Sequence, residues 1–106
     1  MRKVACEEFE EEIVRSTVPV VVLFTNEWCG SAFIVKGAME EIEKDNPGRF
    51  DCIEVNEDEC EEIVRRYGIV HIPLILVFYE SEIVEQIKGV PSRKTMEDSL
   101  NAILIN

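Results

Sequence analysis

The 106 residues predict a single small α/β domain with a central sheet covered by helices on both faces. Short β-branched apolar runs alternate along the chain with longer segments in which apolar residues recur at helical spacing. Residues 20–24 form a continuous apolar run, which is typical of a strand buried on both faces. Glu80-Ser81-Glu82 separates two neighbouring strand patterns, which predicts an antiparallel hairpin at one edge of the sheet.

The first half of the chain predicts two pairs of strand and helix. In order, they are an edge strand at residues 1–4, a helix at 7–16, a buried strand at 18–25 and a long helix at 31–44. The expected inward stripes are Cys6, Phe9 and Ile13 on the first helix and Ile34, Ala38 and Ile42 on the long helix, with Val35 and Met39 beside them. Asn46-Pro47-Gly48 ends the long helix.

The second half predicts three strands and two helices. They are a strand at 50–56, a helix from Asp58 to about Tyr67, strands at 74–79 and 83–88, and a terminal helix at 92–104. Asp58 is the expected cap, because Glu61 follows it at the spacing of a capping box, and Gly68 ends that helix. The inward residues of the terminal helix are expected to be Met96, Leu100, Ile103 and Leu104.

Charge and cysteine usage narrow the classes of function. The net charge of −11 disfavours nucleic acid and anionic membranes as partners. The apolar runs are too short to span a bilayer, and no apolar core follows Arg2 and Lys3 as in a secretory signal, so we expect a cytoplasmic monomer. The cysteines have no zinc-ligand spacing and the chain has one histidine, so we expect no metal.

Trp28-Cys29-Gly30-Ser31-Ala32 stands between a predicted strand and a predicted helix. A cysteine at a helix N-terminus meets free N–H groups and the positive end of the dipole, which favour the nucleophilic thiolate. The position three residues later would hold the second cysteine of a C-x-x-C redox pair, but it is Ala32. The stretch therefore predicts half of a disulfide-exchange site.

Several motifs carry a resemblance to a known family. They are Trp28-Cys29-Gly30, Tyr67-Gly68-Ile69, Ile72-Pro73 and Gly89, together with Phe24, Asn56, Asp58 and Phe78. In this order and at these distances the chain resembles the thioredoxin family, without a gap from Phe9 to Leu104. The resemblance implies the thioredoxin fold, a central mixed sheet of four to five strands flanked by about four helices.

The resemblance also implies roles at the site. Cys29 would be the attacking thiol, and Pro73 would be cis and face it, with Ile72 pairing with an extended substrate. The remaining substrate-binding positions would be Trp28, Gly30, Ser31, Gly89 and Val90. Substrates would be protein or peptide disulfides, no prosthetic group is implied, and a dithiol form would be recharged by a donor such as a flavin-dependent thioredoxin reductase.

The chain departs from the family at Ala32, which cannot resolve a mixed disulfide. Two explanations remain open, namely a natural monothiol form and a Cys-to-Ala variant of a C-G-S-C reductase. A rival hypothesis from another class is a redox-inactive thioredoxin-fold module that binds extended peptides.

A second departure replaces the buried ion pair that is usual in thioredoxins. Leu23 takes the place of the aspartate, and Glu54 takes that of the lysine facing it. If the lone acid Glu54 points inward, burial favours its protonated form, and it could carry a proton for Cys29. In the alternative interpretation Glu54 turns to solvent or bonds locally.

The other candidate residues are His71 and the remaining cysteines. His71 lies two residues before Pro73, on the loop that the resemblance places against Cys29, where it could favour the thiolate or contact substrate. Cys6 and Cys52 are interpreted as small buried apolar residues, and Cys60 as a sluggish thiol among acidic neighbours. A Cys6–Cys60 bridge is conceivable, but a reducing cytoplasm argues against it.

Overall fold

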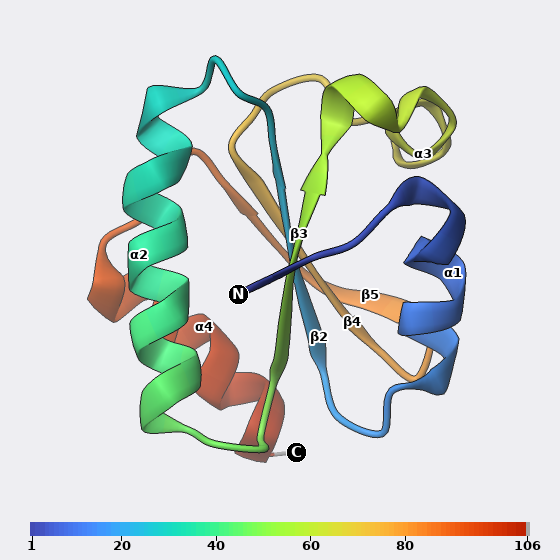
Figure 1. Cartoon of the computed structure of the whole chain (residues 1–106). Helices are drawn as coiled ribbons and strands as arrows, with labels where there is room; N and C mark the ends of the chain where they lie inside the picture. The colour runs from blue at the N-terminus through green and yellow to red at the C-terminus, as the bar shows by residue number, and fades with distance from the viewer. Residues whose placement is uncertain (106) are drawn as a thin grey trace.

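A five-stranded mixed sheet divides the molecule into two layers (Figure 1). The computed structural model describes residues 1–105, of which Leu104 and Ile105 are described by their backbone alone. The strands are β1 (Arg2–Lys3), β2 (Val20–Thr25), β3 (Asp51–Asn56), β4 (Leu74–Tyr79) and β5 (Glu82–Lys88). The helices are α1 (Cys6–Arg15), α2 (Gly30–Asp45), α3 (Glu61–Tyr67) and α4 (Arg93–Ile105), with a 3₁₀ turn, η1 (Glu57–Glu59), before α3.

The sheet order is β1-β3-β2-β4-β5, which puts β2 at the centre. β2 runs parallel to β3, which pairs Leu23 with Glu54, and antiparallel to β4, which pairs Phe24 with Leu74. All six residues of β2 are buried, as its continuous apolar run predicts. β4 and β5 form the expected hairpin. This architecture confirms the predicted α/β class.

Alternate residues of the strands face opposite sides of the sheet, so the core consists of two apolar layers. One layer packs under α1 and α3 and includes Phe9, Val22, Phe24, Ile53 and Val55. The other packs under α2 and α4 and includes Val21, Leu23, Cys52, Met39 and Met96. Figure 1 shows α2 and α4 on one side of the sheet and α1 and α3 on the other. Because alternate residues of a strand face opposite layers, Glu54 shares the α2 side with Cys52 and Leu23.

Local predictions differ from the structure at two helices. The predicted inward stripe of α2 is partly wrong, because Ile34 is exposed while Ala32, Val35, Met39 and Ile42 are the buried residues. Asp58 does not cap α3. Its backbone N–H instead donates to the Asn56 side chain, 2.9 Å away, at the start of η1.

The terminal helix and the helix ends follow the sequence patterns more closely. Met96 and Leu100 are buried in α4 and Ile103 packs beside them, while the prediction for Leu104 lies outside the described side chains. Gly68 ends α3 in the left-handed region with φ 62°, where a side chain is disfavoured. The hairpin turn uses the same region at Glu80 (φ 52°) and Ser81 (φ 66°).

The two edges of the sheet are short or charged. β1 has two residues, and among the described strands it pairs only with β3. β5 carries Glu82, Glu85 and Lys88 along a mostly exposed strand.

Candidate functional site

Cys29 occupies the N-cap position of α2, in the loop that leaves the C-terminal end of β2. Its backbone N–H donates to the carbonyl of Asn26 (3.3 Å), and its own carbonyl accepts from Ala32 N–H (3.2 Å). The thiol is unpaired and half-buried, and its Sγ lies 3.5 Å from Ser31 Oγ. Ser31 lies inside the first turn of α2, so its hydroxyl is close enough to interact with the sulfur of Cys29.

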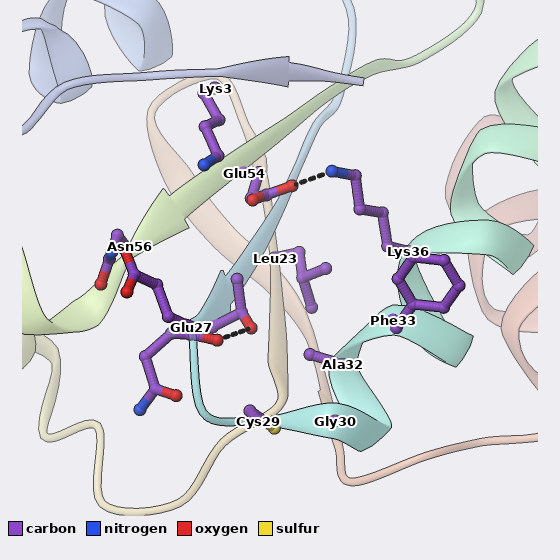
Figure 2. Close-up of a pocket in the computed structure, with 12 residues that line it drawn as sticks. Lys3, Leu23, Glu27, Cys29, Gly30, Ala32, Phe33, Lys36, Glu54 and Asn56 are labelled. Atoms are coloured by element: carbon purple, nitrogen blue, oxygen red, sulfur yellow. Dashed lines mark hydrogen bonds and ion pairs between the residues drawn. The ribbon is translucent and has the colours of Figure 1, made fainter.

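A cavity of about 300 Å³ opens beside Cys29 between α2 and the ends of β1, β2 and β3 (Figure 2). It brings together four of the predicted site residues, Cys29, Gly30, Ala32 and Glu54. The cavity also contains Lys3 from β1 and Lys36 from α2. Ala32 is 5% exposed and has no group that could exchange with a disulfide at Cys29.

Glu54 is buried and is not the lone acid expected from the sequence. Its Oε2 lies 2.8 Å from Lys36 Nζ, and apart from this ammonium the oxygen has no polar partner among the described residues. The hydrogen bond with Glu54 raises the pKa of Lys36 above its usual value, against the opposing effect of burial. Lys36 therefore takes the place of the missing ion-pair partner, from a helix rather than from a strand.

Asn26 fixes the loop that carries Cys29. Its side-chain oxygen accepts the Trp28 backbone N–H at 2.9 Å, and its Nδ2 donates to Glu57 Oε1 at 3.1 Å. The Trp28 side chain is 86% exposed, so it lies open on the surface beside the thiol rather than packing into the core. The hydrogen bond between Asn26 and Glu57 thus ties the loop to η1, while Trp28 faces solvent.

Pro73 and Gly89 form a second group of predicted site residues. The Ile72–Pro73 peptide bond is cis, and Gly89 N–H donates to the carbonyl of Pro73 at 3.0 Å. Phe24 of β2 pairs with Leu74, which in turn pairs with Lys88 of β5. The chain segments next to these three residues therefore lie at the same end of the strands, where the Cys29 loop also lies. Val90 is 46% exposed at this edge.

His71 lies on a different cavity from Cys29. Its side chain is exposed and lines a hollow of about 240 Å³ with Val70, Gln86 and Lys88. Cys29 and His71 line different cavities, and the expected effect of His71 on the thiolate stays a prediction.

Cys6 and Cys60 are joined as a disulfide, and their interpretation as separate thiols is wrong. Their Cα atoms are 5.4 Å apart. β1 and β3 are parallel neighbours, with Lys3 opposite Glu54, so both chain segments leave the same edge of the sheet and the two cysteines meet there.

Cys52 is buried on β3, as expected for a small apolar residue. Burial raises the pKa of its thiol to about 12, with a smaller contribution from the charge of Glu43. Cys52 therefore stays a protonated thiol at neutral pH and is no candidate for exchange chemistry.

Among the described residues, no group of three or more histidine, cysteine or acidic side chains is arranged to hold a metal ion. Within the same part of the chain, the helices are too short or too polar to cross a membrane.

Sequence reasoning missed Asn26, Phe33 and Lys36. Lys36 follows Ala32 by one helical turn, which is a detectable signal that both face the same side of α2. Asn26 gave only the weak signal of an amide side chain directly after a strand, where it can accept a hydrogen bond from the backbone two residues on. Phe33 lines the cavity and is 81% exposed.

Comparisons with known proteins agree over most of the chain. A family model described as Thioredoxin matches residues 1–102. A thioredoxin from Rickettsia bellii is 33% identical over 93 residues, covering 88% of this chain and 89% of the relative. Thioredoxin 1 from Nostoc sp. is 32% identical over 92 residues, covering 87% and 86%. Chloroplastic Thioredoxin M4 of Arabidopsis thaliana is 31% identical over 98 residues, which are 92% of this chain but 51% of that protein, so the chain spans about half of its length.

Proposed function

The chain belongs to the thioredoxin family, and from this membership we propose that it exchanges protein or peptide disulfides through Cys29 used as a single thiol. The observation that carries the proposal is the free, half-buried Cys29 at the N-terminus of α2, three residues before a buried alanine. Free backbone N–H groups at this position favour the attacking thiolate.

The first step is attack of the Cys29 thiolate on one sulfur of a substrate disulfide. The Cys29–substrate bond forms, the substrate S–S bond breaks, and the second substrate sulfur leaves as a thiolate that takes up a proton. Position 32 offers no thiol to continue. An external thiol then attacks Cys29 Sγ, which releases the substrate thiol and leaves Cys29 joined to the small thiol. A second external thiol removes the latter as a disulfide and restores the Cys29 thiolate.

Glu54 and Lys36 supply the proton handling in this proposal. Both line the cavity beside Cys29. Glu54 is 7% exposed and forms an ion pair with Lys36. A carboxylate in that position can take the Cys29 proton through cavity water and return it to a leaving thiolate. Lys36 acts as a positioning residue, because its ion pair with Glu54 holds that side chain at the cavity.

In this proposal the substrate binds at the end of the strands, where the residues around Cys29 and the residues around Pro73 both lie. We propose that Trp28, Gly30 and Ser31 contact one side of the bound substrate, and that Ile72, Pro73, Gly89 and Val90 contact the other. His71, which is exposed and lines a separate hollow, is proposed as a further substrate contact. We further propose that the protein is a cytoplasmic monomer. Only a form with a second cysteine at position 32 would be recharged by a thioredoxin-reductase-like donor.

The test is mixed-disulfide formation with a neutral peptide whose cysteine is activated as a 2-pyridyl disulfide. Wild-type protein is expected to release pyridine-2-thione and gain one peptide mass at Cys29, and an added small thiol should remove that peptide. Cys29→Ser should do neither, while Cys52→Ala should react like wild type because Cys52 is buried. Equal reaction of the wild-type and Cys29→Ser proteins would overturn the proposal.

The second candidate is a peptide-binding module without turnover. The high exposure of Trp28 (86%) and Phe33 (81%) beside the cavity favours it, since both rings could bury apolar peptide side chains. Measurable binding of the reduced, non-activated peptide, together with no thione release from its activated form, would support this candidate instead.

A further inference from the structure

The Cys6–Cys60 disulfide is unequally accessible from its two sides. Cys6 is half-buried at the start of α1, whereas Cys60 is 3% exposed between η1 and α3. A hollow of about 410 Å³ opens onto both cysteines. Because Cys6 is the more exposed residue of the two, we expect an incoming thiol to attack its sulfur.

The rim of this hollow is acidic. Glu7, Glu10, Glu59 and Glu62 line it, and Arg66 is the only cation among the described residues that do so. Arg66 is paired with Glu10 and with Glu62, at 3.5 Å in the second case, but four carboxylates against one guanidinium leave a net charge of −3, and Glu7 and Glu59 have no ion-pair partner among the described residues. A thiolate that carries further negative charge is repelled there, while a cationic group beside its sulfur is attracted.

We propose that the Cys6–Cys60 disulfide is a second redox site, opened by cationic or uncharged thiols in preference to anionic ones. The incoming thiolate attacks Cys6 Sγ, the Cys6–Cys60 bond breaks, and Cys60 leaves as a thiolate that takes up a proton. A second equivalent of the reductant attacks the mixed disulfide at the reductant's own sulfur. Cys6 is released as a thiol, and the reductant leaves as its disulfide.

A continuous set of hydrogen bonds joins this disulfide to the loop of Cys29. Cys60 N–H donates to the carbonyl of Glu57 (3.3 Å), and Glu57 Oε1 accepts from Asn26 Nδ2 (3.1 Å). Asn26 in turn holds the backbone N–H groups of Trp28 and Cys29. The disulfide thus anchors η1, and η1 anchors the loop, so reduction at Cys6–Cys60 slows peptide exchange at Cys29. This last part rests on the proposed function of Cys29.

The first experiment uses the Cys29→Ser protein, so that Cys6–Cys60 is the only exchangeable site. Cysteamine, 2-mercaptoethanol and 3-mercaptopropionate serve as cationic, neutral and anionic thiols. Reduction is followed by alkylation and peptide mass spectrometry and corrected for each thiolate fraction. At low salt we expect cysteamine to react at least about tenfold faster than 3-mercaptopropionate, a difference that high salt should largely remove.

Two variants make this experiment specific. Glu7→Gln with Glu59→Gln should narrow the difference between the thiols, whereas Glu8→Gln, on an exposed residue that does not line the hollow, should leave it unchanged. Equal corrected rates for the three thiols, or no response to the double substitution, would overturn the charge preference.

The second experiment measures the link to Cys29 with the activated neutral peptide. Cys6→Ser with Cys60→Ser is expected to slow thione release about threefold or more relative to the disulfide-bonded protein. Glu57→Leu should do the same without touching the disulfide. Cys6→Ser alone, which keeps the buried Cys60, serves if the double variant does not fold. An unchanged rate in folded variants overturns the link, whereas failure of the disulfide-bonded protein to react at all rejects the function proposed for Cys29 and leaves the first experiment intact.

Discussion

Glu54 on β3 and Lys36 on α2 form an ion pair, with Oε2 2.8 Å from Nζ. Figure 2 shows this pair in the same pocket as Cys29. The Glu54 side chain is 9% exposed and that of Lys36 is 33% exposed. A carboxylate at this depth depends on its partner, because no other group among the described residues donates a hydrogen bond to the paired oxygen.

The first prediction concerns this pair. Lys36→Met should lower the free energy of unfolding by about 1–3 kcal/mol at neutral pH, because it leaves a buried charge without a partner while water still reaches the site. Adding Glu54→Leu should recover most of the loss. Urea unfolding of the single and double variants measures this, and equal stability of Lys36→Met and wild type would contradict it. The pKa of Lys36 is raised, so the pair's contribution is present below the usual value of 10.5 and is lost as pH rises through the folded-state pKa.

The second prediction concerns the missing thiol. Ala32→Cys should raise insulin reduction with a dithiol donor by at least about tenfold, because a thiol held one helical turn from Cys29 resolves the mixed disulfide within the molecule. The matched control, Cys29→Ser with Ala32→Cys, should stay at the background rate. If Ala32→Cys leaves the rate unchanged although the protein is folded, more than one part of the exchange machinery is absent, and the peptide-binding candidate gains support.

The third prediction concerns alkaline pH. The folded protein holds the Cys52 proton up to a pKa of about 12, whereas the unfolded chain releases it near the ordinary value of 9.0. Above pH 9 the unfolded state binds fewer protons, so stability should fall as pH rises, by about 1.4 kcal/mol per unit from this group. Unfolding between pH 9 and 10.5, where Lys36 is still charged, should show a shallower slope in Cys52→Ala. Parallel slopes in the two proteins would count against the burial argument.

The fourth prediction concerns the β4–β5 turn. Glu80 and Ser81 both adopt positive φ, where Asn-Gly is favoured. Glu80→Asn with Ser81→Gly should therefore raise the free energy of unfolding by about 1 kcal/mol. Gly68→Ala provides the opposite case. Apart from its neighbours along the chain, no described residue has an atom within 4 Å of an added Cβ, so the expected loss of about 1 kcal/mol comes from the positive φ. Thermal or urea unfolding measures both changes, which should be a gain in stability for the turn variant and a loss for Gly68→Ala.

The sequence predicts the layers of this fold well because its signals are local. The run of β2 is apolar throughout, and α3 ends at a glycine with φ 62°, so strand and helix ends agree with the patterns to within one or two residues. The exception at α3 has a physical reason. Asn56 and Asp58 are both capping residue types, and only the register of β3 decides that Asn56 accepts the N–H of Asp58.

The predictions that were wrong or incomplete concern contacts between elements that are far apart in the sequence. Ile34 and Val35 lie on adjacent stripes of α2, and periodicity alone could not decide which stripe faces the core. The Lys36–Glu54 pair joins a helix and a strand, and the Cys6–Cys60 bridge joins positions 54 residues apart. Both follow from the parallel order of β1, β3 and β2, which the residue pattern does not specify.

The two edges of the sheet bear on how the protein behaves at high concentration. An unpaired strand edge is a template for another chain, and growth along it leads to cross-β aggregates. Here β1 has only two residues with which another strand could pair. A second copy adding to β5 would bring the acidic side chains of Glu82 and Glu85 close to those of the first copy, and the like charges would repel. With a net charge of −11, the folded chain is protected against fibril growth from either side.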